Sequence, residues 1–262
     1  MTILYSHSFY KKEKSDIMIK IQNISKSYKK GDKVIDNLDI EVKDGEIFGF
    51  IGQNGAGKTT TIKMMTGILE IDEGDIFIDG KSIKNEPIEA KKQIGLVPDS
   101  PDMFLKFSGI EYLNFIADCY NISKEERVKQ IEKLSKEFEI YDELENKIES
   151  YSHGMRQKIV IIGVLLHNPK NWILDEPITG LDPKSSFDLK TLMKEHARKG
   201  NTVFFSTHIL EIAEKLCDRI AIINKGKIVF VGTLDDLRNK YGNEKTLEEI
   251  FLNLIKIGEN NE

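Results

Sequence analysis

The chain has 262 residues, of which 40% are hydrophobic and 31% are charged, and this balance is typical of a soluble globular protein with a large buried core. Its formal net charge of -5 at pH 7 argues against a nucleic-acid partner, which a strongly basic surface would indicate. The two cysteines, Cys119 and Cys217, are far apart, fit no metal-ligand spacing and suit a reducing compartment such as the cytoplasm.

The N-terminal part of the chain begins with a polar leader over residues 1–17, which we expect to be disordered. Its lysines follow the short apolar piece, so it matches neither a signal peptide nor a membrane anchor. No apolar run elsewhere reaches the roughly 20 residues that span a bilayer. Apolar and polar residues then alternate over 19–21 and 38–42, which predicts two strands of an N-terminal sheet.

A glycine-rich segment follows the apolar run 47–51, which is typical of a buried strand. The segment matches the phosphate-binding pattern G-x-x-x-x-G-K-[ST] in full. The nucleotide-binding residues predicted here are Gly52, Gln53, Asn54, Gly55, Ala56, Gly57, Lys58, Thr59 and Thr60. The glycines let backbone N–H groups turn inward around phosphate oxygens, and a helix that begins near Gly57 adds its positive dipole end. Lys58 is placed to reach the β- and γ-phosphates, and the Thr59 hydroxyl to bind the accompanying Mg²⁺.

The middle of the chain changes from strand patterns to helical ones. Strands predicted over 75–80 and 94–98 are followed by an amphipathic helix predicted from Gly109 to Asn121. A capping signal at Ser123 opens a second helix, predicted to run through Glu139. We therefore expect an inserted helical subdomain at about residues 105–165.

Apolar strand patterns return over 172–174, 203–205 and 220–223, with helical stretches between them, which is the order of parallel βαβ units. Residues 234–256 have the pattern of two short helices before a polar end. The expected organisation is a leader (1–17), a main α/β domain that contains the helical insert (18–233) and a C-terminal helical tail (234–262).

The strand pattern that begins at Asn171 ends in two carboxylates, Asp175 and Glu176. A strand end beside a phosphate loop is where an acid that organises Mg²⁺ and a base that polarises water are needed. We expect Asp175 to hold the metal through its water shell and Glu176 to orient the water that attacks the γ-phosphate. Taken alone, an acidic pair before Pro177 is also a common turn.

In their order along the chain, these motifs resemble those of the nucleotide-binding subunit of an ABC transporter, from Met18 to about Val231. The resemblance implies an α/β P-loop NTPase fold with a RecA-like parallel core sheet, an N-terminal antiparallel β subdomain and an inserted α-helical signature subdomain. It implies ATP and Mg²⁺ as cofactors, with Tyr28 stacked on the adenine ring; a packed surface tyrosine is the alternative. It also implies that Ser152 and Gly154, at a helix N-terminus, grip the γ-phosphate of a nucleotide held by a second subunit.

Two further residues take their expected roles from the resemblance. Asp182 ends the segment 179–182, which resembles the loop that crosses the dimer interface, although a helix cap before Pro183 explains this aspartate equally well. His208 follows a strand end at the point where the family places a histidine against the γ-phosphate and the catalytic water.

The chain departs from the family pattern at two places. His153 and Met155 stand where the signature usually has glycine and glutamine; this pattern is similar to that of exporters of drugs, bacteriocins and sodium, so the resemblance implies export. Methionine lacks the hydrogen-bonding groups of an amide, so a contact to the nucleotide sugar is lost or replaced by packing. Asp99 stands where the family has a glutamine that binds Mg²⁺; a carboxylate is still a hard-oxygen ligand, but it is shorter and adds negative charge.

The leading hypothesis is an ATPase subunit that drives a separate polytopic membrane permease at the cytoplasmic face of the cell membrane. A second copy of the chain would close with the first head to tail on two ATP molecules, because Ser152 can act only on a nucleotide bound by a partner. The membrane subunit is expected to dock near the junction of Asp99 and the helical insert.

Two alternative classes are a non-transport ABC ATPase, which would act as a regulator on a soluble assembly such as a chromosome or a ribosome, and a small-molecule kinase. The interval 60–152 holds no long coiled coil of the kind that chromosome-maintenance ATPases need, and ribosome-acting regulators normally carry two such domains. A kinase with a phosphate loop would lack the elements at Ser152, Gly154 and His208.

Overall fold

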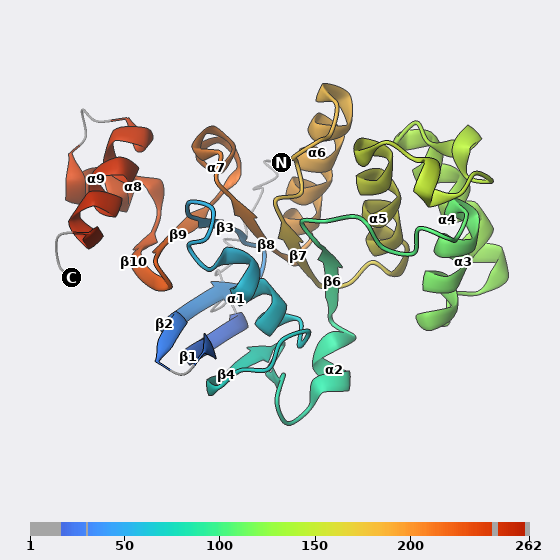
Figure 1. Ribbon diagram of the computed structural model, residues 1–262. Coiled ribbons are helices and arrows are strands. Elements are labelled where there is room, and N and C mark those ends of the chain that lie inside the picture. Colours follow the sequence, from blue (N-terminus) through green and yellow to red (C-terminus); the bar gives the residue numbers. More distant parts are fainter. Residues whose placement is uncertain (1–16, 30, 243–245, 260–262) are drawn as a thin grey trace, which may run out of the picture.

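The computed structural model of the protein describes residues 17–29, 31–242 and 246–259, and Figure 1 shows the path of the chain. The predicted disorder of the leader falls on residues outside these ranges, except for Ile17, which already belongs to the first strand. The division into domains stays a prediction.

The smaller of two sheets is antiparallel, with the strand order β2-β1-β4-β5. Its strands are β1 (Ile17–Lys29), β2 (Asp32–Lys43), β4 (Glu73–Ile78) and β5 (Lys81–Ser82). Alternate side chains such as Ile19 and Ile21 are buried on one face, as the alternating sequence pattern predicts. β1 is longer than the predicted strand because it continues beyond a register shift near Asn23, whose φ is +48°.

The larger sheet forms the centre of the molecule and has the strand order β10-β9-β3-β8-β7-β6. The strands are β3 (Ile47–Ile51), β6 (Ile94–Val97), β7 (Asn171–Asp175), β8 (Thr202–Thr207), β9 (Arg219–Asn224) and β10 (Lys227–Gly232). All neighbouring pairs are parallel except β9 with β10. Every residue of β3, β7 and β8 is buried, which explains their continuous apolar runs. Together the two sheets confirm the predicted fold class.

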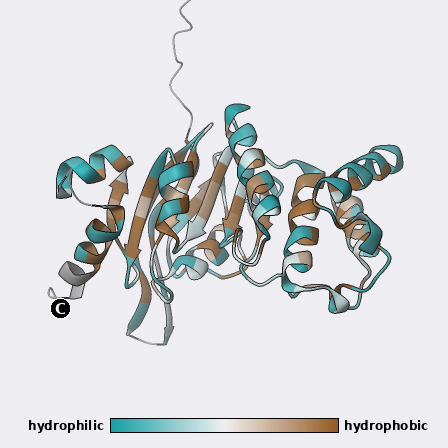
Figure 2. Cartoon of the chain, turned by 90° about the horizontal axis from the view of Figure 1, so that it is seen from above, coloured by the Kyte–Doolittle hydropathy of each residue, from teal (hydrophilic) through white to brown (hydrophobic). Residues whose placement is uncertain are grey.

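Helices cover the central sheet, and their apolar stripes face it (Figure 2). They are α1 (Lys58–Met65), α6 (Pro183–Arg198) and α7 (Leu210–Leu216). The short helix α2 (Pro87–Lys91) instead packs against β4 and β5 of the smaller sheet. The tail adds α8 (Leu234–Tyr241) and α9 (Leu247–Glu259), so the prediction of two short C-terminal helices is confirmed. Ile250 and Leu254 of α9 share a core cluster with Ile220 and Ile222 of β9, which anchors the tail to one edge of the sheet.

A helical region lies between β6 and β7 in the sequence. It contains α3 (Gly109–Cys119), α4 (Lys124–Glu137), two short 3₁₀ turns (Tyr141–Glu143 and Ile148–Ser150) and α5 (His153–His167). The Ser123 side chain caps α4, as predicted, by accepting a hydrogen bond from the Glu126 N–H group. Both predicted helices end two residues early, and Asn121 and Glu139 adopt left-handed φ values of +55° that a helix cannot continue through.

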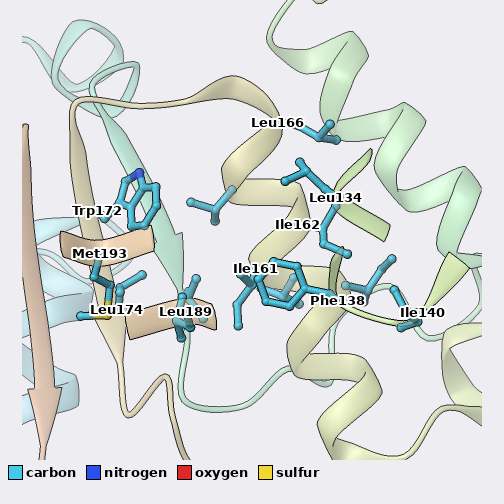
Figure 3. Packing of buried hydrophobic residues seen from close by; sticks show 14 of the residues in the cluster. Leu134, Phe138, Ile140, Ile161, Ile162, Leu166, Trp172, Leu174, Leu189 and Met193 are labelled. Carbon is cyan, nitrogen blue, oxygen red and sulfur yellow. The ribbon is translucent and has the colours of Figure 1, made fainter. Parts of the chain in front are cut away.

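The helical region is joined to the central sheet by one continuous apolar core. Figure 3 shows Ile161 and Ile162 of α5 between the side chains of α4, such as Leu134, and those of β7 and α6, such as Leu174 and Leu189. All of these side chains are buried. α5 therefore ties its own N-terminus, at Ser152, firmly to the rest of the molecule.

One close approach inside the core involves a cysteine. Gly49 of β3 lies directly against Cys217, because a Cβ atom at Gly49 would be only 2.5 Å from the cysteine Sγ atom. Burial raises the pKa of the Cys217 thiol. Cys119, at the end of α3, is exposed.

Candidate functional site

The phosphate loop (residues 52–59) connects β3 to α1, as its sequence predicts. Gly55 and Gly57 have φ values of +81° and +111°, in the left-handed region that favours glycine. A Cβ atom at Gly57 would lie 2.5 Å from Cδ1 of Ile35, so a side chain there would also displace Ile35. Gly57 precedes the first turn of α1, and among the described residues no side chain caps this turn. The backbone N–H groups of this first turn therefore point into the space enclosed by the phosphate loop, where an anion can accept their hydrogen bonds.

The remaining loop residues brace this turn. The Ala56 N–H group donates to the Gln53 carbonyl at 3.1 Å, and Gly226 donates to the Ala56 carbonyl at 2.9 Å. A Cβ atom at Gly52 would come within 2.7 Å of the Ile223 carbonyl oxygen. The loop is therefore held from β9 and from the turn that follows it, and its shape is fixed by packing as well as by its own sequence.

Lys58 is buried at the start of α1, where its ammonium group is surrounded by oxygen atoms. It donates to the carbonyl oxygens of Gly52 at 2.8 Å and Gln53 at 3.2 Å. Its Nζ atom also lies 3.3 Å from Oε1 of Glu176. This contact is an ion pair by distance only, since Oε1 has no hydrogen-bond partner of acceptable geometry. The positive charge therefore lies between the phosphate loop and the end of β7.

The two carboxylates predicted at the end of β7 lie at different depths. Asp175 is buried, and its Oδ1 atom accepts a hydrogen bond of 2.5 Å from the Ser206 hydroxyl on the neighbouring strand β8. Burial raises the pKa of Asp175, while the hydroxyls of Ser206 and Thr59 oppose the rise and the charges of Asp99 and Glu176 add to it. Asp175 is therefore close to both other predicted metal ligands.

Glu176 turns away from the strand direction and contacts His208, the residue that follows β8. Its φ is +49°, an uncommon value for a residue with a side chain. Its Oε2 atom accepts a hydrogen bond from Nδ1 of His208 at 3.0 Å. The structure thus brings both predicted catalytic residues together, although they are 32 positions apart in the sequence.

A cavity of about 520 Å³ collects most of the predicted residues. Its lining comprises Val34, Asn54, Gly55, Gly57, Lys58, Thr59, Thr60, Asp99, Glu176, Thr179 and His208. Gly52, Gln53, Ala56 and Asp175 belong to the surrounding loop and strand but not to the lining. Val34 was not singled out from the sequence, since it lies in β2 and only the folding of the two sheets brings it to this cavity. Thr179 begins the segment 179–182, which was predicted to lie at the dimer interface and not in the cavity lining.

Tyr28 lies at the rim of this region. Its side chain is 60% exposed, and its hydroxyl is 3.5 Å from the hydroxyl of Thr60. The side chain is therefore accessible to a flat ligand, which can stack on its ring.

Ser152, Gly154 and Asp182 lie outside the cavity lining. Ser152 caps α5 by accepting a hydrogen bond of 3.2 Å from the Met155 N–H group. Gly154 packs against the backbone of Gly180, whose oxygen would be 2.8 Å from a Cβ atom at Gly154. Asp182 is the N-cap of α6 and pairs with Lys158 at 2.8 Å, which holds the pKa of Asp182 well below its usual range. The helix-cap explanation of Asp182 is confirmed.

The site fits a nucleoside triphosphate with Mg²⁺. The cavity has inward backbone N–H groups and a buried ammonium group for phosphates, and hard oxygen donors at Thr59, Asp99 and Asp175 for a divalent cation. Within the described ranges, no cluster of three or more His, Cys, Asp or Glu side chains could bind a metal alone. Phosphate and water oxygens would complete the coordination, as is usual for Mg²⁺. The fold and these residues define a P-loop ATPase.

Comparison with known proteins places the chain in a family. The sequence model described as ABC transporter matches residues 35–179. Among curated proteins, the uncharacterized ABC transporter ATP-binding protein YhcH of Bacillus subtilis (strain 168) is 37% identical over 220 residues, which are 84% of this chain and 71% of YhcH. The linearmycin resistance ATP-binding protein LnrL of the same organism is 34% identical over 231 residues, 88% of this chain and 74% of LnrL.

A solved structure described as the ATP binding subunit of an ABC transporter has a TM-score of 0.85 and 33% identity, and the match covers 90% of this chain and 99% of that one. The chain therefore belongs to the ABC transporter family as an ATP-binding subunit, and its activity is ATP hydrolysis. In the part of the chain that the structure describes, no helix is both long and apolar enough to cross a membrane.

Proposed function

We propose that this subunit binds and hydrolyses Mg-ATP in a head-to-tail dimer of two copies, and that the dimer drives export through a separate polytopic membrane subunit. The observation that carries the proposal is the separation of two elements within one chain. Lys58, Glu176 and His208 line the cavity, whereas Ser152 and Gly154 lie outside it, at the start of α5. A second copy would supply its own helix start to close the cavity, which gives a two-fold symmetric pair.

Each residue in the cavity has a proposed task. The phosphate loop and Lys58 hold the phosphates, Tyr28 stacks on adenine, and Thr59, Asp175 and Asp99 hold Mg²⁺ directly or through water. Bound Mg²⁺ supplies positive charge that offsets the charge developing on the phosphates. Glu176 accepts a proton from the attacking water, and His208 fixes the Glu176 carboxylate through its Nδ1–H group. Asp182 contributes to the dimer interface while it caps α6.

A groove beside the helical region supports docking of the membrane subunit there. It has a volume of about 260 Å³ and lies between the ends of α1 and β6 on one side and α3 and α5 on the other. Ile68, Met103 and Phe104 line it and are 63%, 37% and 39% exposed. Exposed apolar side chains that gather in one groove are typical of protein interfaces. Leu96 and Met103, which flank Asp99 in the sequence, both line the groove. A protein segment docked there would therefore contact the chain on both sides of Asp99.

The proposed direction of transport rests on two observations. His153 and Met155 follow the pattern of the exporter branch, and the relative LnrL is named for resistance to linearmycin. His153 and Gly154 contact Gly180 of the neighbouring loop. We expect the cargo itself to be selected by the membrane subunit.

Copurification from cells tests the proposal. The tagged chain should bring down a polytopic membrane protein, and the complex should fractionate at the cytoplasmic face of the membrane. Ile68→Glu in the groove should abolish this capture, because burying the new carboxylate against the membrane subunit would be unfavourable. The ATPase rate of the isolated subunit should be retained. Val128→Glu, at a residue 58% exposed on α4 and outside the groove, is the matched control and should leave capture unchanged. Capture of ribosomes or DNA without a membrane protein would contradict the transport role.

A further inference from the structure

Ser206, near the end of β8, makes two hydrogen bonds to the carboxylate pair through one hydroxyl. The Oγ atom donates to Oδ1 of Asp175 at 2.5 Å and accepts the backbone N–H group of Glu176 at 3.0 Å. The side chain is fully buried, so water does not compete for either bond. One oxygen thus connects the side chain of one acidic residue with the backbone of the next.

The pairing of the strands explains this arrangement. Ser206 is the register partner of Asp175 in the parallel ladder between β7 and β8. β7 ends at Asp175, and Glu176 departs from the strand with a φ of +49°. A residue with a side chain is uncommon in this conformation, which costs free energy of order 1–3 kcal/mol unless its surroundings favour it. The bond from the Glu176 N–H group to Ser206 fixes the backbone where the strained turn begins.

The turn determines where the Glu176 carboxylate lies. From this backbone position its two oxygens reach Lys58 at 3.3 Å and His208 at 3.0 Å. A Glu176 backbone in the extended conformation of β7 would direct the side chain elsewhere, because successive side chains of a strand point to opposite faces. The position of Glu176 in the cavity therefore depends on the bond at its own N–H group.

We propose that Ser206 is a positioning residue for ATP hydrolysis, which holds the Asp175 carboxylate and the Glu176 turn in a fixed mutual arrangement. The inference rests on the proposed function, in which Asp175 serves the metal and Glu176 orients the attacking water. The donated bond holds the Asp175 carboxylate in one rotamer, and the accepted bond keeps Glu176 aimed at His208. Misplacement of either carboxylate by about 1 Å is enough to lower turnover strongly.

Three substitutions separate hydrogen bonding from packing. Ser206→Ala removes the hydroxyl, Ser206→Cys keeps a side chain of similar size with a weak donor, and Ser206→Thr keeps the hydroxyl. We expect kcat to fall on the order of tenfold or more in the Ala and Cys variants and to be largely retained in the Thr variant. Ser135→Ala is the matched control, since Ser135 is also fully buried and donates to a backbone carbonyl, that of Ile131, far from the site.

Metal affinity provides a readout that does not depend on turnover. In this experiment Mn²⁺ is used in place of Mg²⁺ in the presence of ATP. Binding is measured as the decrease in the paramagnetic resonance signal of unbound Mn²⁺. The Ala and Cys variants should bind Mn²⁺ about threefold or more weakly, while ATP affinity measured without metal changes less than about twofold. Ser135→Ala should lower the melting temperature but change neither quantity. Wild-type turnover and Mn²⁺ affinity in both Ser206→Ala and Ser206→Cys would overturn the proposal and leave Ser206 a structural residue.

A double-mutant cycle with Glu176→Gln distinguishes failure of the inference from failure of the proposed function. If Ser206 acts through Glu176, Ser206→Ala should lower turnover by less than about twofold in the Glu176→Gln background. An equal fall in both backgrounds would contradict action through Glu176. A wild-type rate in Glu176→Gln alone would instead overturn the proposed role of Glu176, and the inference with it.

Discussion

Glu176 and His208 are joined by a hydrogen bond of 3.0 Å between Oε2 and Nδ1. Glu176 follows β7 and His208 follows β8, which are neighbours in the parallel sheet, so their carboxyl ends open at the same edge. The remaining Glu176 oxygen faces Lys58. A single carboxylate therefore lies between the phosphate-binding lysine and the histidine, where a proton acceptor for ATP hydrolysis is needed.

Replacement of this carboxylate tests its catalytic role. Glu176→Gln should keep ATP binding but lower turnover on the order of 100-fold or more, because an amide cannot accept the proton of the attacking water. The ATP-bound dimer should then accumulate and elute earlier in size-exclusion chromatography with Mg-ATP. Glu211→Gln, at an exposed position of α7, should behave as wild type. A Glu176 variant that hydrolyses ATP at the normal rate would remove this residue from the role.

Lys58 should control affinity for the nucleotide. Lys58→Ala is expected to weaken ATP binding on the order of tenfold or more while the fold persists, because backbone groups build most of the loop. Calorimetric titration with ATP measures the change. Lys63→Ala removes an exposed lysine from the last turn of the same helix and should leave affinity unaltered. Equal affinity in the two variants would count against the assignment.

Asp99 should influence the metal. It lines the cavity, and its charge raises the pKa of Asp175, so the two carboxylates are close. Asp99→Asn should increase the Mg²⁺ concentration for half-maximal ATPase activity by about threefold or more, because a hard anionic ligand is lost. Asp99→Gln should restore part of the affinity with the amide that the family uses. Unchanged Mg²⁺ dependence in both variants would show that Asp99 is a loop residue with no role in metal binding.

A buried histidine should make the stability of the protein depend on pH. His196 is stacked on Trp172 with ring centroids 4.0 Å apart, and burial lowers its pKa to about 4. In the unfolded chain this histidine takes up a proton near pH 6.5, whereas in the folded chain it does so only near pH 4. The contribution of His196 to the free energy of unfolding is therefore fully present above pH 6.5 and is lost as the pH falls towards 4.

The expected loss is about 2 kcal/mol in the free energy of unfolding between pH 7.5 and pH 5. Denaturant titrations at the two pH values measure it. In His196→Gln this contribution should disappear, so the difference between wild type and variant isolates the histidine from all other titrating groups. A pH dependence that is identical in the two proteins would mean that His196 is not buried in its neutral form.

The residues themselves predicted those parts of the site that are formed by neighbouring positions in the sequence. The phosphate loop, the acidic pair at Asp175 and the helix cap at Asp182 each depend on a few neighbouring positions. Ser206 was missed because its role exists only through the register of β7 with β8, and a serine in a strand pattern gives no local signal. Strand β10 was missed for a similar reason, since it is an antiparallel addition to a sheet whose other strands are parallel.

The contrast between the two cysteines makes this chain convenient for spectroscopy without any substitution. Thiol reagents react with the thiolate, which burial suppresses at Cys217, where the sulfur is pressed against Gly49. A maleimide dye added at neutral pH should therefore attach at Cys119, on the exposed end of α3. The native sequence thus provides one preferred labelling site for a fluorophore on the helical region, and the fluorescence of that dye can report in real time whether ATP changes its surroundings.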